Sequence, residues 1–249
     1  MIKALLLRRY WLIRHRFRST ISFMILFPLM FHTCITLVLE DIIVLSVYNI
    51  SYQVWVFPGV IFLISAASTY TIIYRDFFDL RIHRISFLPI TLAPYGKTYL
   101  ILGFILTSII ESFFHVLVSM IVLTVLMSES LHWNIYLLTP IFAFAYSFLL
   151  ANIMVTFAII SDRIFTFLSF SILMFLFIVF GTGMIVEFDS YPQIIGQILT
   201  YNPLSMILSE LRNILFFNYF EWAWLVIPVV VSIIWTIFNG LLLKRKLKQ

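Results

Sequence analysis

Long apolar runs separated by short polar stretches dominate the pattern of this chain. A helix needs about 20 apolar residues to cross a hydrocarbon layer roughly 30 Å thick, and six runs reach that length. These runs cover residues 21–39, 54–74, 99–126, 135–160, 164–186 and 222–243. They are continuous rather than alternating, which favours helices over a β-barrel. The pattern therefore predicts a single all-α domain over residues 1–249 with six transmembrane helices.

Residues 3–18 mix leucines and aromatic rings with arginines instead of forming another apolar run. This composition is typical of an amphipathic helix that lies in the headgroup plane of a membrane. Trp11 favours this interpretation, because an indole ring is more favourable at the membrane–water interface than in solvent. We assign Arg8, Arg9 and Arg14 to the same interfacial helix. The alternative is a basic start that only sets the topology.

Two prolines mark irregular points in the pattern. Pro28 lies inside the first run and predicts a kink or a local break there. Asn202-Pro203 precedes apolar residues at helical spacing within the last outer connection, 187–221. We expect one or two short helices that lie at or dip into the outer interface before the last span. Asn202, Pro203 and Arg212 belong to this predicted re-entrant segment.

Composition and charge placement support a membrane protein and set its expected orientation. The chain is 63% hydrophobic and 11% charged, far outside the range of soluble domains. Fifteen of its sixteen Lys and Arg residues fall before the first run, in the second and fourth connections, or after the last run. By the positive-inside rule, both termini and the 75–98 connection should be cytoplasmic. The net charge of +5 then reflects topology, and we expect no nucleic-acid partner.

The stretch 75–98, RDFFDLRIHRISFLPITLAPYGKT, combines aromatic and aliphatic residues with several charges. It can neither cross a bilayer nor stay fully solvated, so we expect it to lie at the membrane surface and contact a partner. Its Gly96-Lys97-Thr98 string lacks the first glycine of a phosphate-binding loop, because Thr91 occupies that position. The energy source should therefore be another chain or an ion gradient.

Glu111 lies inside the third run, and His115 follows four residues later on the same helical face. An ionisable residue at membrane depth is costly and therefore a candidate for function. The two residues could relay protons or contact a polar substrate, or Glu111 could be paired and tie two helices together. No protease or esterase motif accompanies them, and the single Cys34 allows neither an intrachain disulfide nor a thiol metal site. We expect no catalytic or metal-binding residues and no enzymatic activity.

Three features together resemble the permease subunits of type-2 ATP-binding cassette (ABC-2) exporters. The basic amphipathic start resembles their interfacial connecting helix. YRDFFDLRIHRISFLPITLAPYGKTYLILG is similar to their loop after the second span, and YNPLSMILSELRNIL is similar to their outer segment before the last span. The chain departs from the usual pattern after the Arg75-Asp76 pair, where Phe77 and Phe78 replace a common glycine.

The resemblance implies a permease that works as a homodimer, or with a similar chain, in a bacterial inner membrane and in contact with its lipids. Two ATPase subunits would bind ATP and Mg²⁺, and this chain would bind no cofactor. Segment 76–88 would be a coupling helix that docks into an ATPase groove, with Phe77, Phe78 and Ile82 as buried anchors. The residues assigned to coupling are Arg75, Asp76, Phe77, Phe78, Asp79, Leu80, Arg81, Ile82 and Arg84.

Two functions follow as hypotheses. The first is an ATP-driven exporter of a lipid-linked glycan, a lipid or an amphipathic drug. The alternative is an ion-coupled secondary transporter that uses Glu111 and His115.

Overall fold

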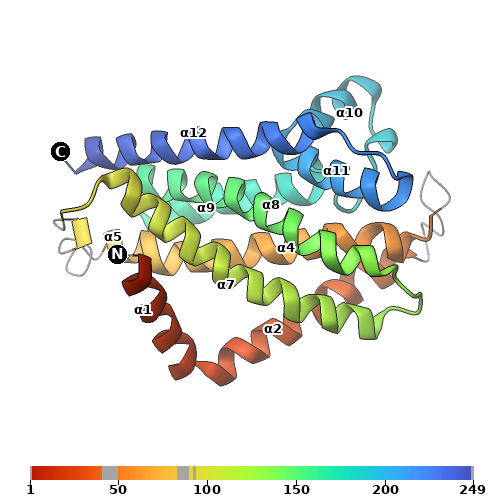
Figure 1. Ribbon diagram of the computed structural model, residues 1–249, viewed down its shortest axis with the longest axis horizontal. Helices are drawn as coiled ribbons and strands as arrows, with labels where there is room; N and C mark the ends of the chain where they lie inside the picture. Colours follow the sequence, from red (N-terminus) through yellow and green to blue (C-terminus); the bar gives the residue numbers. More distant parts are fainter. Residues whose placement is uncertain (1, 41–49, 83–89, 92–93, 248–249) are drawn as a thin grey trace.

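The computed structural model describes residues 2–40, 50–82, 90–91 and 94–247, and these residues contain helices but no β-strand. Five long helices run along the long axis of the molecule (Figure 1). They are α4 (Tyr52–Ile73), α7 (Lys97–Leu126), α8 (Trp133–Ile160), α9 (Ile164–Gly181) and α12 (Trp222–Lys246). The N-terminal helix α1 (Ile2–His15) runs across that axis and meets α2 (Phe17–Phe31) at an elbow.

Six helical stretches in the described residues are long and apolar enough to cross a membrane, as the sequence predicts. Their bounds are Phe17–Glu40, Tyr52–Ile82, Lys97–Leu126, Trp133–Ile160, Ile164–Gly181 and Trp222–Lys246. By length and composition, the chain is an integral, multi-pass membrane protein.

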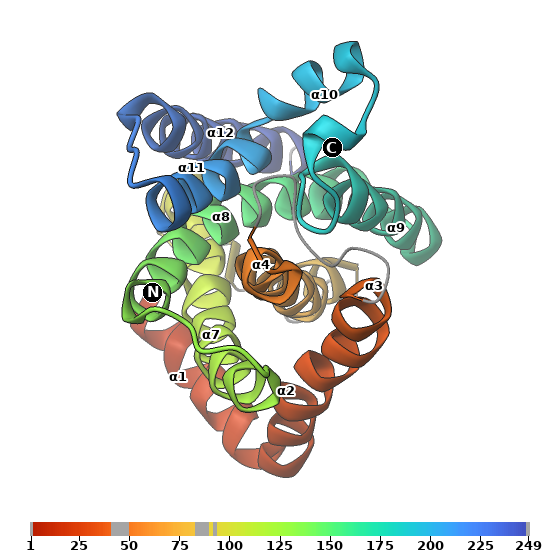
Figure 2. The ribbon, with the colours of Figure 1, turned by 90° about the vertical axis from the view of Figure 1, so that its right-hand side faces the viewer.

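Helix α4 occupies the centre of the bundle (Figure 2). In the span Tyr52–Ile82, which contains α4, 89% of an apolar stretch of 18 residues is buried inside the bundle. The corresponding shares are 17%, 22% and 28% for the spans Phe17–Glu40, Ile164–Gly181 and Trp222–Lys246. A helix that is apolar on all sides is suited to such a central position. The three peripheral spans leave most of their apolar surface open to lipid or to another chain.

Small polar residues join the central helices. The Ser65 hydroxyl of α4 contacts Ser112 of α7 at 3.2 Å and also contacts Ser147 of α8. Further along α8, Asn239 of α12 donates to the Asn152 carbonyl at 2.9 Å. Small residues let helix backbones approach closely, and hydrogen bonds across helices supply attraction where lipid and protein are equally apolar.

The first span continues through Pro28, and its hydrogen-bond pattern changes one turn later. A π-helical stretch, η1 (His32–Thr36), separates α2 from α3 (Leu37–Glu40). Proline has no N–H to donate to the preceding turn, so the helix loses little stability when its hydrogen-bond pattern becomes irregular nearby. The local irregularity predicted at Pro28 therefore lies just after it.

Two predicted spans have different ends in the structure. The second span does not stop at residue 74, because α4 continues through a π-helical stretch, η2 (Tyr74–Asp79), into α5 (Leu80–Ile82). The fifth span stops at Gly181 instead of residue 186, and the backbone of 182–186 makes bends. Tertiary contacts described below pair the charged side chains of η2 and the unpaired backbone carbonyls of 182–186.

The predicted short helices of connection 187–221 are present at the end of the bundle opposite α5 (Figure 1). A 3₁₀ turn, η3 (Phe188–Ser190), precedes α10 (Gln193–Thr200) and α11 (Pro203–Phe217). Asn202 caps α11 by accepting a hydrogen bond from the Leu204 N–H at 3.1 Å, and Pro203 occupies its first turn. This is the arrangement that favours a helix start.

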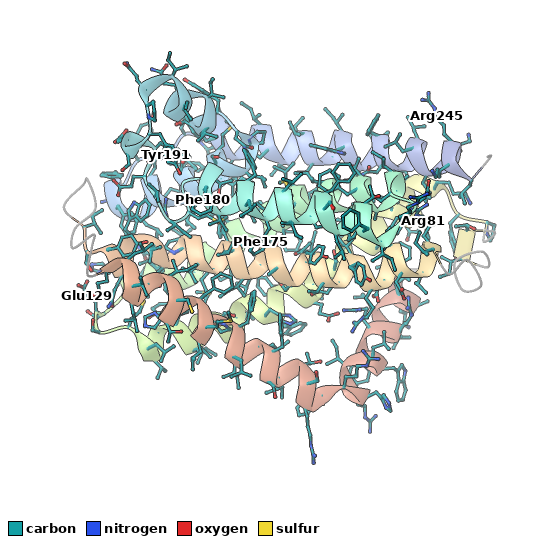
Figure 3. All side chains as sticks on the ribbon, turned by 180° about the vertical axis from the view of Figure 1, so that it is seen from behind. Arg81, Glu129, Phe175, Phe180, Tyr191 and Arg245 are labelled. Carbon is teal, nitrogen blue, oxygen red and sulfur yellow. The ribbon has the colours of Figure 1, made fainter. Side chains whose placement is uncertain are left out.

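The basic segments gather at one end of the bundle. Helix α1 begins and α12 ends at the end that carries α5 (Figure 1). Figure 3 shows Arg81 and Arg245 at this end and Glu129 at the opposite one. The segments that the charge count groups on one side of the membrane thus share one end of the fold.

Candidate functional site

A buried ionic network joins α1 to the bundle and is the main candidate site. Arg9 of α1 is only 4% exposed. Its guanidinium pairs with Asp76 of η2 at 2.7 Å and with the carboxylate of Glu111 in α7. Because isolated charges are costly in a dry interior, a buried arginine between two carboxylates makes these three helices depend on one another.

Two more arginines extend the network. Arg75 Nε lies 3.5 Å from Asp76 Oδ1, and Arg8 Nη2 lies 3.9 Å from the same oxygen. Both side chains are about one third exposed, in contrast to Arg9. Asp76 therefore lies at the junction between the buried pair and the surface of the molecule.

His115 is close to Glu111 but does not share its carboxylate. Its Nδ1 lies 3.0 Å from the backbone carbonyl of Glu111, one turn earlier in α7, and can only donate to that oxygen. The ring also packs edge-on against Phe23 of α2, with centroids 6.1 Å apart. The predicted proximity of Glu111 and His115 is present, whereas the partner of the Glu111 carboxylate is Arg9.

A cavity of about 190 Å³ opens beside this network, between the α1–α2 elbow and helices α4 and α7. Its inner wall is buried and includes Arg9, Glu111 and His115. Its mouth is exposed and includes Arg16 and Ser19. The ionisable groups of the candidate site therefore face a space that reaches the surface.

The predicted aromatic anchors of the coupling segment lie inside the bundle. Phe77 and Phe78 are 0% and 1% exposed. Phe77 packs against Phe104 of α7, and Phe78 stacks on Phe167 of α9 with centroids 4.4 Å apart. The prediction that they insert into a partner does not match this placement. Their apolar bulk is what keeps the chain helical and buried past residue 74.

The tip of the same segment is tied to other elements at its end of the bundle. Arg81 donates to Asp162 Oδ1 at 3.1 Å and to the Ser161 carbonyl, and Lys246 donates to Asp162 Oδ2 at 2.7 Å. Hydrogen bonding from Lys246, with a contribution from Arg81, holds the pKa of Asp162 below its usual range. Asp79, Leu80 and Ile82 are half-buried, and Arg84 lies outside the described residues.

A second buried arginine lies at the opposite end. Arg212 of α11 is 8% exposed and donates to the carbonyls of Gly183 and Met184 at 2.5 and 3.1 Å. Its guanidinium also lies 3.6 Å from the centroid of the Trp55 ring in α4. These contacts satisfy carbonyls left without helical partners where α9 stops at Gly181. Arg212, which the sequence assigns to the predicted re-entrant segment, thus lies in the interior.

A helix, α1, is present where the sequence predicts an interfacial one, and it exposes both aromatic and basic side chains. Trp11 is 61% exposed, and Arg14 lies over its ring at 5.6 Å. Arg9 is the exception, because it was expected in the headgroup region and is buried. Leu5 and Arg9 are the buried residues of α1 and lie four residues apart. The spacing of Leu5 and Arg9 predicts that they share one helical face, and Glu111 at membrane depth needs a cation. Together these two signals could have identified the Arg9–Glu111 ion pair.

Comparison of the chain with protein-family models, with curated proteins and with solved structures finds no match. The functional assignment therefore rests on the residues and their geometry.

Proposed function

We propose that the chain is the membrane-spanning permease subunit of an ATP-driven exporter, similar to ABC-2 permeases, and that separate ATPase subunits dock on the end carrying α1 and α5. One observation carries this proposal: η2 and α5 form a charged helical tip that is joined to α1, α7 and the α8–α9 turn. A docking surface that is packed against several spans can transmit a displacement to the whole bundle. The hydrolytic chemistry, ATP and Mg²⁺ would belong to the partner.

The tip would act as a lever. Phe77 against α7 and Phe78 against α9 fill the space behind it, and closely packed interiors transmit displacement instead of absorbing it. Movement of α5 on ATP binding would then displace α4, α7 and α9 as rigid bodies. In this proposal Asp79, Leu80, Arg81 and Ile82 contact the ATPase, while Phe77 and Phe78 transmit the motion.

The orientation follows from charge and helix placement. The end that carries Arg81 and Arg245 would face the bacterial cytoplasm by the positive-inside rule. Helix α1 would lie in the headgroup plane, since it crosses the bundle axis and exposes Trp11. At the outer end, α10 and α11 would form the re-entrant segment that begins at Asn202-Pro203.

A dimer is the proposed assembly. The spans that contain α2, α9 and α12 are only 17%, 22% and 28% buried, and continuous apolar surface marks contact with lipid or protein. A second copy beside these helices would enclose a conduit for a lipid-linked glycan, a lipid or an amphipathic drug.

The test is co-purification with an ATPase chain that has a complete phosphate-binding loop and is encoded beside this one. Asp79→Lys should abolish co-purification, because the half-buried carboxylate lies on the proposed docking tip. Glu129→Lys, the same charge reversal at the exposed opposite end, should leave it unchanged. ATPase binding that is equal in both variants, or export that persists without any ATPase, would contradict the proposal.

A second candidate is ion-coupled transport, which one observation favours: Glu111 and His115 both line the cavity beside α2. A carrier of this kind would lose transport in Glu111→Gln and keep it after removal of the ATPase. An exporter driven by ATP would show the opposite dependence.

A further inference from the structure

The charges around the elbow cavity do not cancel, and the surplus lies at its mouth. Asp76 and Glu111 are in contact with three arginines, Arg8, Arg9 and Arg75. Arg16 also lines the cavity, is exposed, and has no side-chain partner among the residues that the structure describes. The arginines around the cavity therefore outnumber the carboxylates.

Hydroxyl groups stand beside this charge. Ser19 and Thr20 follow Arg16 by three and four residues, so they share its helical face, and both line the cavity. Thr71 of α4 also lines the cavity, but its hydroxyl already donates to the Ser68 carbonyl at 2.8 Å. An arginine fork with neighbouring hydroxyl donors is suited to an oxygen-rich anion, and guanidinium binds phosphate through two parallel hydrogen bonds.

The surroundings indicate where such an anion comes from. The cavity lies at the elbow that follows α1, whose exposed Leu7, Tyr10 and Trp11 suit the interface between headgroups and acyl chains. Phe23, which also lines the cavity, is 39% exposed and continues the mouth into an apolar surface. A space of about 190 Å³ with a basic mouth and an apolar edge suits a headgroup whose acyl chains remain outside.

We propose that this cavity binds the phosphate of an anionic phospholipid from the leaflet in which α1 lies, with Arg16 as its main contact. The bound phosphate would neutralise the surplus charge at the mouth and hold the α1–α2 elbow against α4 and α7. The site goes beyond the proposed export function and does not depend on it, because it requires no ATPase partner.

The experiment measures lipid retained by the purified full-length protein in detergent by native mass spectrometry. Phosphatidylglycerol should remain bound to the wild type, and phosphatidylcholine should be retained much less. Arg16→Gln should lower the affinity for phosphatidylglycerol about tenfold, as expected for the loss of a charge-assisted contact.

Arg18→Gln is the matched control, because Arg18 lies two residues after Arg16 in the first turn of α2, is also exposed, and does not line the cavity. Its affinity should stay within about twofold of the wild type, since only long-range attraction to the surface is lost. Both variants should elute from size exclusion like the wild type, because neither residue is buried.

Inorganic phosphate separates the two sources of the anion. If millimolar phosphate leaves the lipid in place, the lipid assignment is supported. If free phosphate displaces it completely, the lipid assignment is overturned. Equal losses in Arg16→Gln and Arg18→Gln, or equal retention of both lipids, would overturn the site itself.

Discussion

The two ends of the bundle each bury an arginine, and they do so in different ways. Arg9 is held by carboxylates from two other helices, whereas Arg212 is held by backbone carbonyls and an indole ring. The carboxylates of Asp76 and Glu111 are buried and need a positive charge nearby. The carbonyls that bind Arg212 belong to the 182–186 turn, which packing also supports. Arg9 therefore makes separate helices interdependent, and Arg212 secures a local turn.

This difference fits different tasks. Apart from the Arg9 network, α1 is largely exposed and buries little besides Leu5. A helix attached mainly through an ion pair can be released by a change in charge or by a competing partner. The 182–186 turn, by contrast, is packed under α11 and against α4, as expected of a fixed part of the scaffold.

Removal of Arg9 should have the largest effect. Arg9→Gln leaves Glu111 buried without a cation, while Asp76 keeps only its contacts with Arg8 and Arg75, and the loss should cost about 3–5 kcal/mol. Release of α1 should follow, measured as faster hydrogen exchange in α1 and a lower midpoint of thermal unfolding. Arg14→Gln, at an exposed position of the same helix, should change neither.

A double variant tests whether the charge pair is the cause. Arg9→Gln with Glu111→Gln removes the unpaired charge, so it should be more stable than Arg9→Gln alone. If the two losses simply add, the ion pair does not hold α1 in place.

Removal of Arg212 should have a smaller and more local effect. Arg212→Gln loses two charge-assisted hydrogen bonds and the contact with Trp55, at a cost of about 2–3 kcal/mol. The loss should appear as a change in tryptophan emission and in exchange of 182–186, while α1 keeps its protection. Arg163→Gln, which removes an exposed arginine, is the control. Release of α1 in Arg212→Gln would show that the two ends are not independent.

Gly59→Ala probes the packing of the 182–186 turn without altering charge. A Cβ at residue 59 would lie 2.5 Å from the carbonyl oxygen of Met184, so the turn must move. Overpacking of this kind costs about 1–3 kcal/mol. Gly96→Ala has no atom within 4 Å of its added Cβ and should unfold like the wild type. A Gly59→Ala midpoint equal to that of Gly96→Ala would contradict tight packing at this turn.

The smallest effect concerns Asp162 at the end that carries α5. Its folded-state pKa is lowered, so the ionised form contributes stability above the ordinary value of 3.8 and loses it as the pH falls through the folded-state pKa. Asp162 is exposed, so water and salt screen its ion pairs with Lys246 and Arg81. Their contribution to stability is therefore less than about 1 kcal/mol. Comparison of wild type with Asp162→Asn should show a difference near neutral pH that vanishes below that pKa. A difference that persists in strong acid would assign the effect to shape instead of charge.

Local pattern was sufficient for the elements with long or capped sequences. The six spans and the helix that starts at Asn202-Pro203 follow from apolar length and cap chemistry, which act within a few residues. Charge placement also identified which segments share one end of the bundle. These features depend little on what packs against them.

The tertiary structure decided which polar residues are buried. Arg9 and Arg14 have similar local surroundings in the sequence, and only the positions of Asp76 and Glu111 place one inside and leave the other exposed. Phe77 and Phe78 have the composition of surface anchors, yet Phe104 and Phe167 enclose them. Burial of a charge or a ring depends on partners distant in the chain, because desolvation must be offset by contacts that no local pattern contains.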